Sequence, residues 1–353
     1  MRGAWKAGKA ALYLGHLILA ASPPCFALSP PNLSDISDFK LTPGSAAALP
    51  SPLAASGATL ADTRGDEVGT SDPRLDAPAL PYGPEDRATI EPNPAPRRFN
   101  SFGAQLASVK WEMAAITGYY TAINGHKLFK DPVAPHVHKE GWFGKSTANL
   151  GVDKLAHAYS AYILSEIIHA RLRRKTDDAP GIALTAAVLG SATMLYTELW
   201  DSIESDGGWS WEDVAFNSMG AGFSLLRNSI PELDKKLDFR LMIMPNSDIV
   251  TVAGKRHFEQ QHYFFALKLA GFAALERSPL RFAELHLGYY GKDFTIEERA
   301  RGVEPKRRIF VGVGINLREL FFKHARSPVG RAAGDVLDYF QPPYTALHRH
   351  ITN

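Results

Sequence analysis

The sequence predicts an α+β protein, in which an antiparallel bundle of about four helices is followed by a small antiparallel β-sheet or partial barrel. Segments of helical length and apolar pattern fill residues 104–229, and short segments rich in aromatic and β-branched residues follow from about residue 238. Residues 28–100 are dense in Pro, Ala, Ser and Gly and lack a sustained apolar period. The expected parts are a signal peptide (1–27), a disordered linker (28–100), a helical domain (101–236), a β-rich domain (237–325) and a tail (326–353).

The amino terminus has the pattern of a signal peptide. Basic residues precede an apolar core at 10–21, and Cys25-Phe26-Ala27 offers small residues at the −3 and −1 cleavage positions. The core is shorter than the roughly 18–20 residues that span a bilayer. A short membrane anchor and lipidation of Cys25, the only cysteine, are the alternatives. We therefore expect an exported protein that resides in the periplasm or at the outer membrane.

Four helices are expected in the helical domain. The first stops at Asn124-Gly125, and the third has no charged residue from Gly181 to Thr197. That uncharged run allows a membrane span, a half-inserted helix or a buried core helix. The expected helices are Ala104–Ile123, Asp153 to about Arg174, the stretch after Pro180 to about Trp200, and Ser210 to about Ser229.

Four strands are expected in the β-rich domain. They are short, and the last alternates cleanly between apolar positions and Phe310, Gly312, Gly314 and Asn316. A closed outer-membrane barrel normally needs at least eight strands, so an open sheet or a partial barrel is expected. The tail should hold one short helix and a Pro-Pro segment. The expected strands are Arg240–Ile243, His262–Gly271, Arg281–Tyr290 and Arg308–Leu317.

Each of the last three helices carries a pair of polar residues on an otherwise apolar face. The pairs are spaced three or four residues apart, which places both members on one side of their helix. A carboxylate on such a face is costly to bury unless it is paired, protonated or bound to a cation. The candidate pocket therefore consists of Asp153, His157, Glu198, Asp201, Asp213 and Asn217.

Several ligands and several purely structural roles suit these residues. Oxygen ligands with one imidazole can hold a divalent metal, for which Glu198, His157 and Asp201 are the candidate ligands. The pocket could instead bind a lipid head group or a glycan fragment. The structural alternatives are a helix cap for Asp213, a favourable helix-dipole position for Asp153 and an internal pair for Glu198.

The same residues carry a resemblance to a known family. The order Asp153-Lys154-x-x-His157, Glu198-x-x-Asp201 and Gly208-Trp209-Ser210-Trp211-x-Asp213-x-x-x-Asn217-x-x-Gly220 resembles the YfiM-like family of predicted periplasmic proteins, domain of unknown function 2279. It is more distantly similar to VanZ-like membrane proteins, from which this chain departs in having one strongly apolar helix. The YfiM-like family has no established activity. The resemblance therefore implies an envelope location and a shared site.

Common catalytic motifs are absent from the sequence. There is no G-x-S-x-G, H-E-x-x-H, P-loop or spaced Cys/His zinc set. The net charge of +2, without basic clusters interleaved with aromatics, gives no sign of nucleic-acid binding.

Three functions remain open from the sequence. The leading expectation is a membrane-associated, non-enzymatic envelope protein that binds a ligand in the polar pocket and contacts the membrane surface or envelope components. A metal-dependent hydrolase of phospholipid or cell-wall polymer, with Glu198 or His157 as general base, is the first alternative. A structural partner in an envelope complex, using Trp209, Trp211 and the strand edges, is the second. The oligomeric state is left open.

Overall fold

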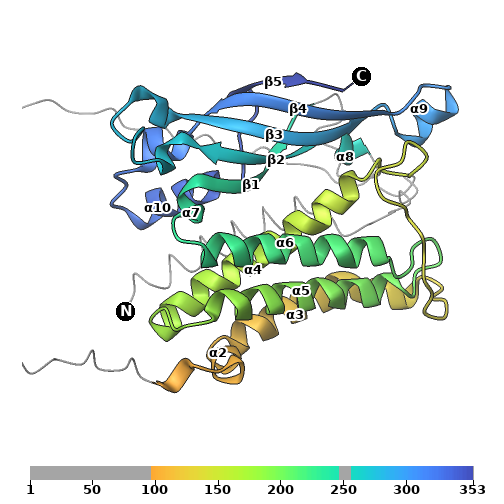
Figure 1. The fold of residues 1–353 in the computed structure, drawn as a ribbon. Coiled ribbons are helices and arrows are strands. Elements are labelled where there is room, and N and C mark those ends of the chain that lie inside the picture. Colours follow the sequence, from red (N-terminus) through yellow and green to blue (C-terminus); the bar gives the residue numbers. More distant parts are fainter. Residues whose placement is uncertain (1–96, 246–255, 353) are drawn as a thin grey trace, which may run out of the picture. The chain divides into compact units, whose positions relative to one another are not determined.

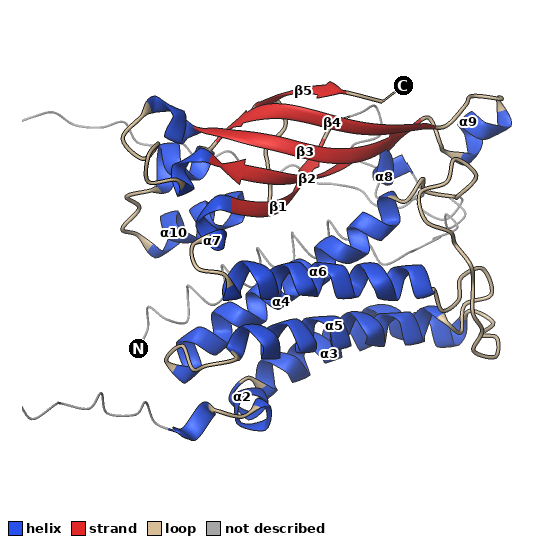
Figure 2. Ribbon diagram, viewed as in Figure 1, coloured by secondary structure: helices blue, strands red, loops and turns tan. Residues whose placement is uncertain are grey.

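The computed structural model describes residues 97–245 and 256–352. The expected signal peptide, Cys25 and the linker up to residue 96 lie outside the described residues. In the described part, long helices pack on one side of an antiparallel sheet (Figures 1 and 2), which confirms the predicted α+β class.

Five helices form the helical layer. The expected first helix is two helices, because the backbone leaves the helical region at Val109 (φ −112°, ψ 14°). No Gly or Pro marks this break, and the buried Val109 side chain packs with residues of the neighbouring long helices. The five are α2 (Phe102–Ser108), α3 (Lys110–Asn124), α4 (Val152–Thr176), α5 (Ile182–Asp201) and α6 (Trp211–Ser229).

Helix α5 is the uncharged helix whose setting the sequence left open. By length and composition, it is the one helix within residues 97–245 and 256–352 that could cross a membrane. Within its apolar stretch, 56% is buried inside the fold. It packs against α4, where Gly190 lies on Ser165, and against α6. The structure therefore uses α5 as a core helix with one outward side.

The sheet has five strands in the order β1-β2-β3-β4-β5, all antiparallel. The fifth strand was not expected, because its sequence is polar and shows no alternation. The segment that precedes β5 crosses from one edge of the sheet to the other. Gln341 N donates to Leu241 O (2.9 Å) at the β1 edge, and Ile315 N donates to Thr345 O (3.1 Å) near the opposite edge. The strands are β1 (Leu237–Ile243), β2 (Gln261–Lys268), β3 (Ala283–Lys292), β4 (Lys306–Ile315) and β5 (Ala346–His350).

Short helical segments connect these elements. The tail holds the expected short helix, α10, as well as β5. The segments are η1 (Arg97–Phe99), η2 (Gly125–Phe129), α7 (Leu233–Lys236), α8 (Arg256–Glu259), η3 (Leu269–Gly271), η4 (Pro279–Phe282), α9 (Ile296–Ala300), η5 (Arg318–Phe322) and α10 (Pro328–Leu337).

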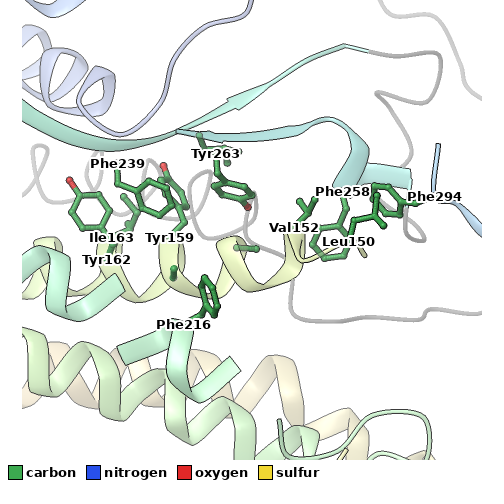
Figure 3. Packing of buried hydrophobic residues seen from close by; sticks show 13 residues of the cluster. Leu150, Val152, Tyr159, Tyr162, Ile163, Phe216, Phe239, Phe258, Tyr263 and Phe294 are labelled. Carbon is green, nitrogen blue, oxygen red and sulfur yellow. The ribbon is translucent and has the colours of Figure 1, made fainter. Parts of the chain in front are cut away.

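An aromatic core joins the helical layer to the sheet. Tyr159 and Tyr162 on α4 point at Phe239 on β1 and Tyr263 on β2 (Figure 3), with Tyr159 and Phe239 ring centres 5.7 Å apart. Such rings bury large apolar areas and dominate core energetics. The helical and β-rich parts thus share one core, and the predicted division between them at residue 236 stays a prediction.

A largely buried set of charges also crosses between the two layers. Arg227 on α6 donates to Glu166 Oε2 on α4 (2.6 Å) and to Asp238 Oδ1 on β1 (3.0 Å). Asp238 also accepts from Lys268 (2.8 Å) and Arg240 (2.8 Å). We call this set the interlayer ion network. It consists of the carboxylates Glu166, Asp238, Glu284 and Asp338 and the cations Arg227, Arg240, Lys268 and Arg318.

Candidate functional site

Glycine and serine at two helix starts position the polar residues of the bundle. Gly151 (φ 80°) turns the chain into α4, which places Asp153 in the first turn. The Ser210 hydroxyl accepts from Asp213 N (3.2 Å) and begins α6. The backbone N–H of Asp213 therefore takes part in the cap of α6, as one of the structural alternatives proposed. Its carboxylate is not used by this cap and faces Lys154 and His157.

Helices α4 and α6 approach closely at Gly220. A Cβ at this position would overlap the carbonyl oxygen of Ala158 on α4. The small residues on this face of α6, Gly220, Ala221 and Ser224, therefore allow the close approach. Because of it, the side chains one to two turns before Gly220 come within reach of α4 and α5.

His157, Glu198 and Asp213 meet inside the bundle, one from each of α4, α5 and α6. His157 Nδ1 lies 3.3 Å from Glu198 Oε1, and His157 Nε2 lies 3.7 Å from Asp213 Oδ1. One ligand atom from each of the three residues lies within 4.8 Å of the others. Asn217 joins them by donating to Glu198 Oε1 (3.3 Å).

Asp153 belongs to a second, adjacent group built around Lys154. The Lys154 ammonium lies 2.8 Å from Asp213 Oδ1 and 3.1 Å from Asp153 Oδ2, and it also pairs with Glu140. We call the combined set the carboxylate site: Glu140, Asp153, Lys154, His157, Glu198, Asp213 and Asn217.

Asp201 is the one predicted pocket residue whose carboxylate is engaged elsewhere. It pairs with the buried Lys127 of η2, which also lies 3.1 Å from Glu204. The spacing of three residues from Glu198 placed Asp201 on the correct side of α5, but Lys127 comes from a segment for which the sequence offered no signal.

Two other members of the site were missed as candidates. Lys154 stands inside the quoted D-K-x-x-H motif, but only its position relative to three carboxylates reveals its role. Glu140 lies in a loop without periodicity. The bonds from His138 N to Trp209 O (2.9 Å) and from Trp209 N to His136 O (2.8 Å) hold this loop beside the start of α6.

The titration behaviour of the site follows from its burial and its crowded negative charge. Burial, together with the Asp213 and Asp201 charges, raises the pKa of the Glu198 carboxyl to about 8 against the opposing effect of His157. Burial and the Asp213 charge also raise the pKa of Glu140 to about 7, against the lowering effect of Lys154.

Asp213 and Lys154 shift the opposite way, towards their charged forms. Burial alone would raise the pKa of Asp213, but His157 and Lys154 outweigh it and hold this pKa below its usual value. Burial would lower the pKa of Lys154, but the Asp153, Asp213 and Glu140 charges together raise it. Asp213 and Lys154 therefore form a permanent ion pair, while Glu198 holds a proton at neutral pH unless another cation replaces it.

Three buried oxygens of the site lack a hydrogen-bond partner within the described ranges: Glu198 Oε2, Asn217 Oδ1 and Asp213 Oδ1, of which the last has the Lys154 ammonium 2.8 Å away. Glu198 is 1% exposed, so water does not satisfy its oxygen from bulk solvent. Buried polar atoms are nearly always satisfied by protein, water or an ion. The His157 side chain (13% exposed) and that of Glu140 (25%) mark where the site approaches the surface.

Comparison with known proteins identifies one similar family. Residues 139–229 match a family described as predicted periplasmic lipoprotein, DUF2279. The matched interval contains all seven members of the carboxylate site and excludes the sheet. No curated protein and no solved structure matches the chain significantly. The match confirms the resemblance to this domain of unknown function and agrees with the expected export to the cell envelope.

Proposed function

We propose that this exported envelope protein binds one divalent metal ion through His157, Glu198 and Asp213. The observation that carries the proposal is the buried, unsatisfied Oε2 of Glu198, within a set of ligand atoms from three helices. A buried carboxylate is stabilised by a proton, a paired cation or a metal. Under this proposal, Glu198 is protonated at acidic pH and is bound to the metal at neutral or alkaline pH.

The charge of the carboxylate site favours a cation on the His157 side. Lys154 is paired with the group formed by Glu140, Asp153 and Asp213, and its single positive charge offsets part of their negative charge. Glu198 has only the imidazole and the Asn217 amide beside it. An anionic lipid head group would add to this excess of negative charge, so the site supports a metal better than a head group.

The ligand types select among metals. One imidazole nitrogen with two carboxylates suits Mn²⁺, Fe²⁺ or Zn²⁺ better than Mg²⁺ or Ca²⁺, which prefer oxygen alone. Three protein ligands leave at least one coordination position open. Asn217 Oδ1 supplies a further oxygen beside Glu198 that can hold a metal-bound water.

Metal binding should compete with protonation of Glu198. Because its pKa is about 8 without a metal, binding at neutral pH releases a proton and tightens as pH rises towards 8. The test is calorimetry of the chelator-treated full chain with Mn²⁺ or Zn²⁺, in buffers of different ionisation enthalpy. We expect one ion per chain and net release of a proton.

Matched variants distinguish the proposed metal ligands from residues that only lie near them. Glu198→Gln and His157→Ala should lower affinity at least tenfold, or about 1.4 kcal/mol. Asp201→Asn makes the same carboxylate-to-amide change one turn away and should leave affinity within twofold, since Asp201 pairs with Lys127. The proposal is wrong if Glu198→Gln and His157→Ala only lower the melting temperature and retain wild-type affinity and stoichiometry.

A metal-dependent hydrolase is the second candidate, favoured by Glu140. Its pKa of about 7 suits a general base, and it lies at the surface edge of the site. Phospholipid and cell-wall polymer should be offered to the metal-loaded protein. Glu140→Gln should abolish turnover while preserving metal stoichiometry, whereas absence of turnover in the loaded wild-type chain would leave the binding role alone.

A further inference from the structure

The outward side of α5 is entirely apolar. Its exposed positions follow the helical repeat as Leu184, Val188, Ala192, Leu195 and Leu199. The four large side chains are 39–55% exposed. Soluble helices normally place charged residues opposite their buried side. Here the helix has an apolar stripe on both sides, and only one of them is covered by the fold.

Helix α6, packed beside α5, continues this exposed apolar surface. Met219 and Leu226 are exposed on its outward side, and Trp211 begins the same stripe at 62% exposure. Between Met219 and Leu226 lies Phe223, whose ring centre is 5.2 Å from that of Phe265 on β2. The half-buried Phe223 therefore connects the exposed apolar residues of α6 to those of the sheet.

The sheet extends the surface across β2, β3 and β4. Phe265 pairs in register with Leu287, which pairs with Val311, while Leu285 pairs with Val313. Residues opposite each other in antiparallel strands share a face, and these five side chains are 41–53% exposed. Figure 1 shows α5, α6 and these strands following one another across the molecule. We call the outward apolar residues of α5, α6 and β2–β4 the apolar face.

Polar and basic groups border the apolar face. Arg349 on β5 stands opposite Val311, Arg307 lies beyond Ile309 on β4, and Arg173 and Arg174 end α4 just before α5. All four are exposed, and Arg173 pairs with Asp178 (3.4 Å). Basic residues at the edge of an apolar surface contact lipid phosphates, and a Trp such as Trp211 prefers the same depth.

A hollow of about 400 Å³ lies at the α5 end of the apolar face. Its lining is mostly apolar and includes Phe102, Pro180 and, from the apolar face, Leu184 and Val188, with the polar Asn100, Gln105 and Thr185 beside them. An apolar hollow of this kind can take part of an acyl chain. Protein–protein interfaces carry about one hydrogen bond per 100–200 Å², whereas the outward residues of α5 offer no side-chain donor or acceptor.

We infer that the apolar face lies on the surface of an anionic lipid bilayer, with the basic border at the head groups. This inference does not depend on the metal site. The match to a family of predicted lipoproteins also supports a setting in which the chain is held next to a bilayer. A second copy of the chain is the competing occupant and is distinguished by the following test.

The test places an environment-sensitive fluorophore on the face of the full chain. In a Cys25→Ser background, which prevents lipidation, the probe is attached at Met219→Cys or Val311→Cys. Vesicles of phosphatidylethanolamine and phosphatidylglycerol should shift the emission of both probes to the blue, and spin-labelled lipids should quench them. A probe at Glu304→Cys, on an exposed charged loop residue, should change in neither respect.

A face variant completes the test. Leu195→Asp with Val311→Asp should reduce vesicle partitioning at least tenfold, with an unchanged circular dichroism spectrum because both positions are exposed. Vesicle binding through the amino-terminal segment alone would leave both face probes unshifted, and this result would overturn the inference. A blue shift that rises with protein concentration without lipid, together with sedimentation as a dimer, would overturn it in favour of self-association.

Discussion

The carboxylate site and the interlayer ion network are both largely buried, but their charges are balanced differently. The network sets four carboxylates against four cations, and each of its carboxylates pairs with a cation, although Glu284 Oε2 has no hydrogen-bond partner among the described residues. The carboxylate site has the four carboxylates of Glu140, Asp153, Glu198 and Asp213, with Lys154 and one imidazole.

This difference separates a structural role from a binding role. A buried ion pair that is complete holds elements together, and removing one member leaves an uncompensated charge. The network accordingly links α4 and α6 to the sheet. A buried group with excess negative charge instead protonates or recruits a cation, as the raised pKa of Glu198 indicates. Four predictions test this contrast, in order of decreasing effect.

Arg227→Met should be the most damaging change, because it leaves Glu166 without its cation and removes one of the three cations that pair with Asp238. Breaking a buried ion pair in this way lowers the free energy of unfolding by about 3–5 kcal/mol. Urea denaturation measures the loss. Lys235→Met is the control, since Lys235 makes an exposed pair with Glu232 and should cost less than about 0.5 kcal/mol. Equal losses in the two variants would contradict a structural network.

Lys154→Met should destabilise by about 3 kcal/mol without added metal, since Glu140, Asp153 and Asp213 lose their shared cation. These three carboxylates offer ligand atoms within 4.8 Å of one another. The variant should therefore bind two Mn²⁺ ions where the wild type binds one, as measured by equilibrium dialysis. An unchanged stoichiometry would show that Lys154 does not exclude a second ion.

Gly220→Ala should lower stability by about 1–3 kcal/mol, because the new methyl group forces α6 away from Ala158 on α4. Metal affinity should fall as well, since His157 and Asp213 are carried by these two helices. Gly222→Ala on the same helix meets nothing within 4 Å, so it should be neutral or slightly stabilising. Thermal unfolding and calorimetry of both variants test whether the helix spacing sets the site.

Glu198→Gln should change how stability depends on pH in the metal-free protein. Between pH 5 and 8 the unfolded chain has lost the Glu198 proton and the folded chain retains it, so this group lowers wild-type stability as pH rises. The stability of the variant relative to wild type should therefore increase with pH, by at most about 1.4 kcal/mol per pH unit.

Glu112→Gln provides a control for this pH profile. Burial would raise the pKa of Glu112, but Lys175 and Arg171 outweigh it and lower this pKa to about 2. Glu112 is therefore ionised in both states over pH 5–8, and its variant should differ from wild type by a constant amount. A flat difference for Glu198→Gln would show that Glu198 is already ionised in the fold.

Much of the fold could be predicted from local pattern. The long helices α4, α5 and α6 were expected within a few residues of their observed ends, and four strands were expected near their observed positions. The break at Val109 and the strand β5 were missed, because neither has a turn residue or an apolar repeat. Each is decided by packing or pairing with residues far away in the chain.

The candidate site was predicted in part for the same reason. Helical spacing brought His157, Glu198, Asp213 and Asn217 onto inward sides, and the structure brings them together. Spacing could not show that Asp201 faces Lys127, nor that Glu140 enters from a loop. Lys127 and Asp201 are 74 residues apart, and Glu140 lies in a loop outside any helical repeat, so only the packing of segments decides these contacts.

The sequence by itself determined the order of helices and strands and the inward sides that carry polar residues, since both follow from the 3.6-residue and two-residue repeats of the backbone. Only the tertiary structure decided which buried charges are neutralised. Charge balance depends on distances between side chains from different elements, and those distances exist only once α4, α5 and α6 are packed. The unsatisfied oxygen of Glu198 and the completed pairs of Arg227 are both consequences of that packing.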